Sequence, residues 1–177
     1  MTGRVEVTIG ELVVALADSS AELHHYLDLE TGRVILIPGE SDRELDRIYE
    51  EIYRADGSQA VPLEAYLEDR DAFKWQKELL LLADEVRQRR RTRYIRVERD
   101  DPYADYADME RFISKVEDPQ LRDRLWRAIK GRGAFRRFKD LLFEHPDTRE
   151  DWFAFKNEQD WQRAEAWLAA RDIEPIS

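Results

Sequence analysis

Residues 128–140 are the stretch of this chain whose side chains are best suited to chemistry. Within thirteen residues they hold two glycines, two phenylalanines and five basic side chains. The free N–H groups and the dipole at the start of a helix favour phosphate or carboxylate, and nearby arginines add positive charge. We therefore predict an anion-binding face where one helix ends and the next begins. Its expected residues are Arg132, Gly133, Arg136, Arg137 and Lys139.

The same stretch also has a purely structural interpretation. Its two glycines permit a sharp turn between helices, and its basic side chains can pair with acidic residues of the same chain. A phosphate-binding loop usually has more glycines than two. The arginines of residues 87–93 either extend the basic face toward nucleic acid or form the solvated end of a helix, where arginine suits the dipole. The sequence leaves both alternatives open.

An acidic cluster follows at residues 100–108, interleaved with two tyrosines. Closely spaced carboxylates can hold Mg²⁺, with water or substrate phosphate completing its shell. Such runs more often form loops and helix N-caps, so we expect no metal and no cofactor here. The weaker metal alternative rests on Asp101, Asp105 and Asp108.

No catalytic motif is present in the sequence. There is no cysteine, no nucleophile elbow, no P-loop and no dinucleotide fingerprint. His24 and His25 are neighbours on a predicted strand, so they point to opposite faces and cannot share a metal. We assign no catalytic residue and favour a protein that is not an enzyme.

Three predicted strands lie in the N-terminal half. Residues 23–29 and 33–37 are rich in β-forming residues and predict a hairpin, with Gly32 supplying the positive φ that the turn needs. Residues 94–97 predict a third strand. Between the hairpin and this strand, Ser41 is expected to cap a helix.

Helices account for the rest of the predicted structure. A long charged helical segment is expected at about residues 60–93, with Trp75, Leu79, Leu82 and Val86 on one inward face. In the C-terminal half, Asp118 followed by Pro119 predicts a helix start. The next two helices are expected to bury two sets of residues. These are Phe135, Phe138 and Leu142, and then Trp152, Phe155, Trp161, Ala164 and Leu168.

The predicted fold class is α+β, in which a small antiparallel β-sheet, made of the hairpin and the third strand, accompanies a predominantly α-helical C-terminal bundle. We expect one domain over residues 1–177, with an α/β part at 1–100 and the helical bundle at 101–177. The chain has a net charge of −10, and its longest apolar run, at 79–83, is far shorter than the ~20 residues that a bilayer requires. We therefore expect an acidic, cytoplasmic protein without a membrane partner.

Charge is unevenly distributed along the chain. Residues 1–86 carry 8 basic and 20 acidic side chains, residues 87–139 carry 17 and 9, and residues 140–177 carry 4 and 10. A basic middle between acidic ends either neutralises itself on folding or leaves a local positive face that attracts anions.

Several motifs together resemble a bacterial uncharacterised protein family, number 0158. They are Tyr-Leu-Asp-Leu-Glu-Thr-Gly-Arg-Val at residues 26–34, the stretch 128–140, residues 109–112 and Trp-Phe-Ala-Phe at 152–155. The resemblance covers most of the chain, and 128–140 is its most specific part. Residues 56–91 are longer and more charged than the resemblance leads one to expect. The family has no established activity, so the resemblance supports the fold and implies no catalytic residue.

Three hypotheses about function follow. The preferred one is a non-enzymatic binding or regulatory module that docks an unknown protein partner or an anionic ligand through the basic junction. The alternative is a nucleic-acid-binding protein in which helices 119–130 and 134–144 act like a helix-turn-helix, which the net charge of −10 disfavours. The third is a Mg²⁺-dependent enzyme that processes phosphates, supported only by the acidic cluster near the arginines.

Overall fold

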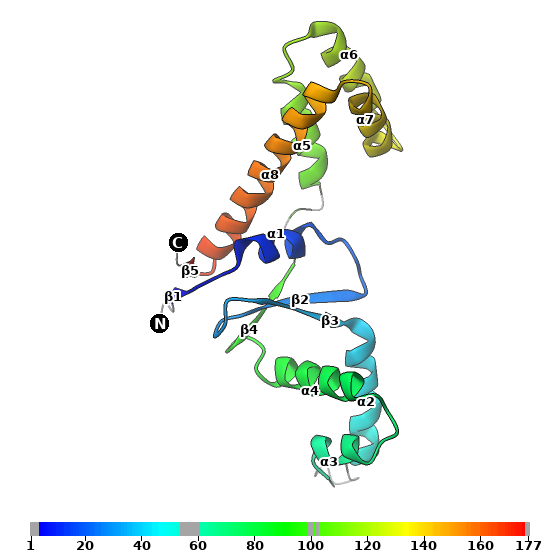
Figure 1. Cartoon of the computed structure of the whole chain (residues 1–177), viewed down its shortest axis with the longest axis vertical. Helices are drawn as coiled ribbons and strands as arrows, with labels where there is room; N and C mark the ends of the chain where they lie inside the picture. Colours follow the sequence, from blue (N-terminus) through cyan, green and yellow to red (C-terminus); the bar gives the residue numbers. More distant parts are fainter. Residues whose placement is uncertain (1–3, 54–60, 99–100, 102, 176–177) are drawn as a thin grey trace. The chain divides into compact units, whose positions relative to one another are not determined.

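The computed structural model describes residues 4–53, 61–98, 101 and 103–175, and it has the predicted α+β class (Figure 1). The chain divides into two compact units, residues 1–98 with 168–177 (unit 1) and residues 99–167 (unit 2). None of the described helices combines the length and apolar composition needed to cross a membrane. The helices are α1 Ile9–Ala17, α2 Gly39–Ile52, α3 Leu63–Glu68, α4 Lys74–Gln88, α5 Ala104–Ile113, α6 Pro119–Ala128, α7 Ala134–Phe143 and α8 Pro146–Ala169. The strands are β1 Arg4–Val5, β2 Leu23–Asp28, β3 Val34–Pro38, β4 Tyr94–Val97 and β5 Glu174–Pro175.

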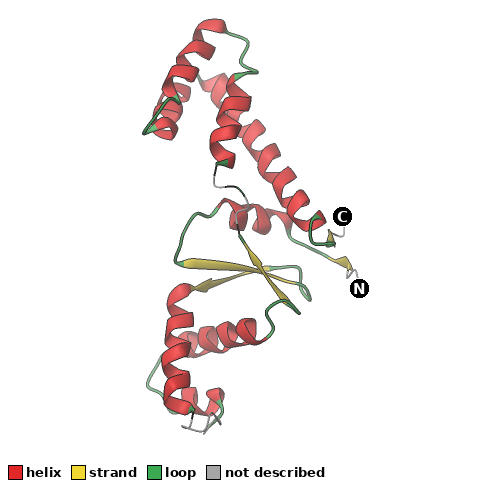
Figure 2. Cartoon of the chain, turned by 180° about the vertical axis from the view of Figure 1, so that it is seen from behind, coloured by secondary structure: helices red, strands yellow, loops and turns green. Residues whose placement is uncertain are grey.

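Unit 1 is built on a three-stranded antiparallel sheet of order β3-β2-β4, which confirms the predicted hairpin and third strand. Tyr26 in the central strand pairs with Ile35 on one side and with Arg96 on the other. Helix α1 lies over one face of this sheet, and α2 and α4 lie over the opposite face (Figure 2). The larger core fills the space between the sheet and α2, α3 and α4.

The turn between β2 and β3 explains the family-like motif at residues 26–34 in structural terms. Gly32 has a φ of 70°, and a Cβ at this position would overlap the backbone carbonyl of Glu6. Asp28, at the end of β2, accepts hydrogen bonds from the Glu30 N–H at 2.9 Å and from the Thr31 hydroxyl at 2.9 Å. This motif therefore folds a tight turn, and nothing in its contacts implies catalysis.

A second, two-stranded sheet joins the two ends of the chain. β1 pairs with β5 in parallel, with Arg4 opposite Glu174 and Val5 opposite Pro175. Two-residue strands separated by nearly the whole chain leave no periodic pattern, so the sequence did not predict this sheet.

The helical segment expected at about residues 60–93 is in fact two helices, α3 and α4. The chain turns between them at residues 69–73, because Leu63, Leu67 and Leu80 all enter the same core. At the start of α4 the Gln76 side chain accepts the Phe73 N–H at 3.0 Å, which marks a new helix without Gly or Pro. Trp75 does not face inward as predicted, because its side chain is 62% exposed.

Ser41 is also not the N-cap that the sequence predicted. Helix α2 begins at Gly39 directly after β3, with Pro38 at the N-cap position and no side-chain cap. Ser41 instead lies within the first turn of α2, where it is only 6% exposed.

Unit 2 is helical, as predicted for this part of the chain. Asp118 caps α6 by accepting the Gln120 N–H at 2.8 Å, and Pro119 follows at the first helical position. Phe138 and Leu142 are buried as expected, in one core with residues of α5, α6 and α8. Two expected core residues are not buried: Phe135 is 45% exposed and Trp161 is 44% exposed.

Candidate functional site

The predicted anion-binding face lies at the junction of α6 and α7. Gly131 has a φ of 75° and Gly133, the N-cap residue of α7, has a φ of 81°. Both values lie in the left-handed region that glycine adopts at little cost, so these residues allow the sharp reversal between the helices. Ile129, at the end of α6, is buried, and its carbonyl accepts the Tyr106 hydroxyl at 3.1 Å. The junction is therefore fixed against the core of unit 2.

The side chain of Arg137 binds the backbone of the α6–α7 junction. Its guanidinium donates to three backbone carbonyls, those of Ala128 at 2.9 Å, Lys130 at 2.7 Å and Arg132 at 2.6 Å. Ala128 is the last residue of α6, and Lys130 and Arg132 lie in the connection to α7. Arg137 therefore caps the end of α6 and also ties the connection to α7. Of the predicted anion-binding residues, this one is engaged by the protein's own backbone.

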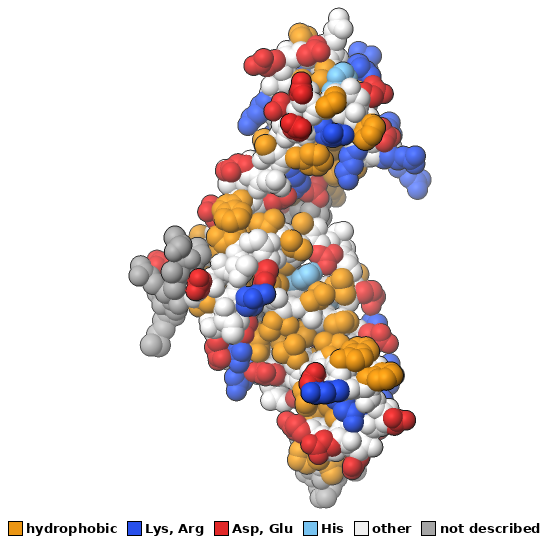
Figure 3. Space-filling model, viewed as in Figure 1, with side chains coloured by type: hydrophobic (Ala, Val, Ile, Leu, Met, Phe, Trp, Pro, Cys, Tyr) orange, Lys and Arg blue, Asp and Glu red, His pale blue; other side chains and the backbone are white. Residues whose placement is uncertain are grey.

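Most of the other basic side chains around this junction are exposed and have no close acidic partner within the described residues. Arg136 reaches Asp140 only at 3.9 Å, and both side chains are exposed. Residues 119–139 carry eight basic side chains and one acidic one. Figure 3 shows Lys and Arg side chains gathered over α6 and α7. Four of them pair with no carboxylate of the described chain, and they are Arg127, Lys130, Arg132 and Lys139; together with Arg136 we call them the basic face.

A surface groove of about 430 Å³ runs along the same helix pair. Three arginines, two carboxylates and the apolar Leu141 line it, among them Arg124 and Glu144, which are paired at 2.9 Å. The groove thus combines charge with some apolar surface, which suits a partner that offers acidic groups on an apolar scaffold.

Most of the second basic run, residues 87–93, is in contrast engaged within unit 1. Arg87 pairs with Asp46 at 2.7 Å. Arg93 makes a two-pronged contact with Asp28, its Nε and Nη2 each 2.8 Å from a carboxylate oxygen. Arg90 donates to the Tyr26 hydroxyl at 2.8 Å. These three arginines stabilise the fold of unit 1, whereas the exposed Arg91 pairs with no carboxylate of the described residues.

The acidic cluster does not bring together the three aspartates of the metal alternative that the sequence suggested. Asp105 and Asp108 come together with Asp160 of α8, with carboxylate oxygens within 4.8 Å of one another. Asp101 lies apart from this group and accepts the Tyr103 N–H at 2.8 Å, while Asp100 is outside the described residues. The ammonium of Lys156 lies among the three carboxylates, 3.1 Å from Asp105 and 3.4 Å from Asp108, and it also pairs with Asp160.

Two arginines complete this ion-pair network. The fully buried Asp108 accepts Arg163 at 2.6 Å and Arg111 at 2.7 Å. Burial alone lowers the pKa of Arg163, but the hydrogen bonds and negative charges of Asp108 and Asp160 together outweigh that effect and raise the pKa. The network joins α5 to α8. Sequence analysis missed it because Asp108 and Arg163 lie far apart in the chain. The local signals were the Lys156–Asp160 spacing of i, i+4 and two i, i+3 spacings, Asp108–Arg111 and Asp160–Arg163.

We predict that millimolar Mg²⁺ or Ca²⁺ leaves the melting temperature unchanged beyond the effect of sodium chloride at equal ionic strength. The reason is that Lys156, Arg163 and Arg111 together already compensate the three carboxylates. Thermal melts of the wild type and of Asp105→Asn provide the measurement. A rise of several degrees in the wild type that is lost in the variant would reveal a metal site, because a bound ion stabilises the folded state.

Comparison with known proteins places this chain in a family. The model of the uncharacterised protein family UPF0158 matches residues 63–177, which include all of unit 2, and no solved structure matches the chain. A Pseudomonas aeruginosa protein, named UPF0158 protein PA5073, is 29% identical over 172 residues, 97% of this chain and 86% of that protein. The α+β protein described above therefore belongs to the uncharacterised protein family UPF0158, which confirms the resemblance seen in its motifs.

Proposed function

We propose that this protein is a binding module that docks an acidic protein segment or another anionic ligand through the basic face of α6 and α7. The observation that carries the proposal is the difference between the two basic stretches. Three of the five arginines of residues 87–93 pair with carboxylates and a fourth contacts Tyr26, whereas four of the five cations of the basic face pair with no carboxylate of the described chain.

Electrostatic repulsion within an unpaired cluster of like charges destabilises the fold, and an anionic partner would remove that repulsion. Side chains such as Arg132 and Lys139 repel one another through solvent, and an anionic partner reverses the sign of that interaction. With a Debye length of about 8 Å at physiological salt, the acidic surface of more distant parts of the chain is largely screened. A net charge of −10 is therefore compatible with local attraction of anions.

The rigid junction supports the same proposal. Because Arg137 fixes the end of α6, the neighbouring cations project from a preformed turn, and binding does not have to order the backbone. The half-exposed Phe135 adds apolar contact area next to them.

The test uses Arg132→Ala/Lys139→Ala, a variant that removes two unpaired cations and leaves Arg137 in place. Four probes are titrated against the full chain: inorganic phosphate, a poly-glutamate peptide, single-stranded DNA and duplex DNA. We expect the poly-glutamate peptide to bind, with an affinity that falls as salt is raised and falls at least several-fold in the variant. Phosphate should raise the melting temperature more than chloride does at equal ionic strength.

The matched control is Arg33→Ala/Arg43→Ala in unit 1. Both arginines are exposed, but each is paired with a glutamate. This control should bind the probes as the wild type does. An equal loss in both double variants would mean that only net charge matters, and the proposed site would be wrong. The proposal would also fail if none of the probes bound.

Nucleic-acid binding is the second candidate, because α6 and α7 form a helix pair with exposed cations. The same titration decides it. DNA would then bind more tightly than poly-glutamate, with a log–log salt slope that grows by about 0.7–0.9 for each phosphate neutralised. The slope would become smaller in Arg132→Ala/Lys139→Ala.

A further inference from the structure

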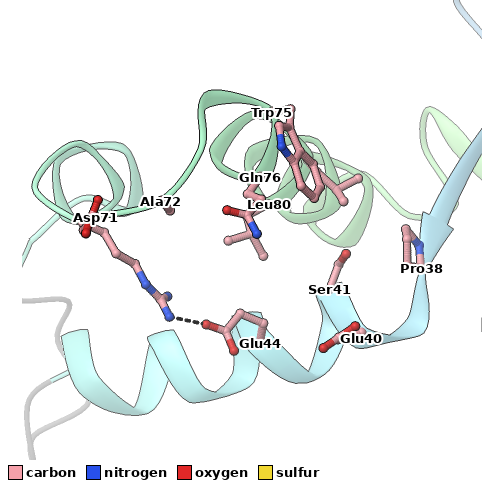
Figure 4. A pocket seen from close by; sticks show the side chains of 11 residues that line it. Pro38, Glu40, Ser41, Glu44, Asp71, Ala72, Trp75, Gln76 and Leu80 are labelled. Carbon is pink, nitrogen blue, oxygen red and sulfur yellow. Dashed lines mark hydrogen bonds and ion pairs between the residues drawn. The ribbon is translucent and has the colours of Figure 1, made fainter.

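A cavity of about 490 Å³ opens in unit 1 between α2 and α4 (Figure 4). Its volume lies within the range of roughly 300–1,000 Å³ that is usual for small-molecule sites. Leu79, Leu80 and Pro38 provide apolar walls, and hydrophobic side chains are visible on the face over α2 and α4 in Figure 3. The apolar walls predict a ligand with an apolar body.

A hydroxyl group that is open to this cavity lines it without a protein partner. The Ser41 residue as a whole is 6% exposed, and within the described residues its side chain makes no hydrogen bond. Its oxygen is not among the enclosed polar atoms of the described residues, so it is accessible from the cavity. Figure 4 shows the Ser41 hydroxyl directed into the space between α2 and Trp75. A polar atom of a ligand in this space would provide the missing partner.

Trp75 forms an aromatic wall of the same cavity. Its ring is 62% exposed, and Phe73 beside it in the chain is 71% exposed. An exposed tryptophan at the mouth of a cavity buries apolar area only when something packs against it. The face of an indole ring is also the best aromatic partner for a cation.

The charged side chains around the cavity favour a ligand with a positive charge. Glu40 and Asp71 line it, and neither pairs with a cation of the described chain. Glu44 differs, because it is compensated by Arg70 at 2.5 Å and by Arg47 at 2.9 Å. The two unpaired carboxylates give the cavity an excess of negative charge.

We propose that this cavity binds an organic cation, an ammonium or guanidinium group on an apolar stem. The stem packs on Leu79, Leu80 and the Trp75 ring. The cationic group donates a hydrogen bond to the Ser41 hydroxyl oxygen and is attracted by Glu40 and Asp71. The site lies wholly in unit 1 and does not depend on the function proposed for the basic face.

Three probes of similar shape test the sign of the charge: benzylammonium, benzyl alcohol and benzoate, each titrated into the full chain at pH 7 and constant ionic strength. Calorimetry gives the affinity, and the NMR signal of the Trp75 indole N–H reports the location. We expect benzylammonium to shift this signal and to bind at least about tenfold more tightly than benzoate. Trp75→Leu, Glu40→Gln and Ser41→Ala should each weaken benzylammonium binding several-fold.

Matched controls are Trp161→Leu, which removes a half-exposed tryptophan of unit 2, and Glu50→Gln, which removes an exposed carboxylate elsewhere on α2. Both should bind as the wild type does. N-acetyl-arginine amide distinguishes the source of the cation: binding of this probe alone would indicate an arginine of a protein, and binding of benzylammonium alone a free amine. Benzoate binding as tightly as benzylammonium would overturn the proposal, as would affinities unchanged in both Trp75→Leu and Ser41→Ala.

Discussion

Replacement of Phe138 by alanine is expected to lower the free energy of unfolding of unit 2 by about 3–5 kcal/mol, the usual cost of truncating a buried phenylalanine. Phe138 is 1% exposed. Its ring packs edge-on against Trp152, with centroids 4.9 Å apart, and against Phe112 at 6.3 Å. The substitution removes the dispersion contacts of the ring and leaves a cavity between rigid aromatic neighbours, which relax little into the space.

Urea unfolding followed by tryptophan fluorescence measures this effect, because four of the five tryptophans lie in unit 2. Phe135→Ala is the matched control, since Phe135 is 45% exposed and three positions away on the same helix. Its cost should stay below about 1 kcal/mol, the level of surface substitutions. Equal losses in the two variants would contradict the orientation of α7 about its axis.

The difference in burial between Phe135 and Phe138 could not be predicted from the sequence. Phe135, Phe138 and Leu142 lie at i, i+3 and i+7, and periodicity alone places all three on one inward face. The face of α7 that is buried depends on the helices packed around it, which contribute Phe112 and Trp152 from distant positions. The same limitation explains Trp75 and Trp161, which share a stripe with core residues and nevertheless lie exposed.

Some local features, by contrast, were predictable, although the N-cap expected at Ser41 was not among them. The Asp118 cap needs only its own side chain and the N–H groups two and three residues later. The hairpin turn needs only Gly32 and the alternating strands around it. Both features depend on a few adjacent residues, and the structure confirms both.

Features that depend on distant partners were not predictable. The sequence marked Arg137 as basic but did not show that three carbonyls of its own helix junction would bind its guanidinium. It also gave no indication that Ser41 and Trp75, from two helices of unit 1, would line one cavity. The location of the basic face was accessible from composition, whereas which of its charges are unpaired required the fold.

The substitution Asp28→Asn is expected to lower the free energy of unfolding of unit 1 by roughly 1.5–3 kcal/mol at pH 7, the usual contribution of a hydrogen bond to a charged group. The Asp28 carboxylate is 3% exposed and binds the Arg93 guanidinium through both oxygens. That contact ties the β2–β3 turn to the start of β4. Asparagine keeps the shape but loses the charge and one acceptor oxygen.

The pH dependence of this difference identifies its cause. Chiefly through the hydrogen bonds from Arg93, the fold lowers the pKa of Asp28 from 3.8 to about 2. A lowered pKa means that the carboxylate stabilises the fold fully above the unfolded-state pKa and loses that contribution as pH falls from about 4 to about 2. The difference in unfolding free energy between wild type and Asp28→Asn should therefore be constant from pH 7 to about pH 5 and shrink below pH 4.

The unfolding free energy of unit 1 is measured by hydrogen exchange of the backbone amides of β2 and β4 as a function of urea concentration. The control is Asp46→Asn, because Asp46 also contacts an arginine, Arg87 at 2.7 Å, but is 59% exposed. An exposed pair contributes at most about 1 kcal/mol, so this variant should differ little from the wild type at any pH. A loss in Asp28→Asn that persists unchanged at pH 3 would mean that its side chain acts through packing, and that the charged contact with Arg93 does not stabilise the turn.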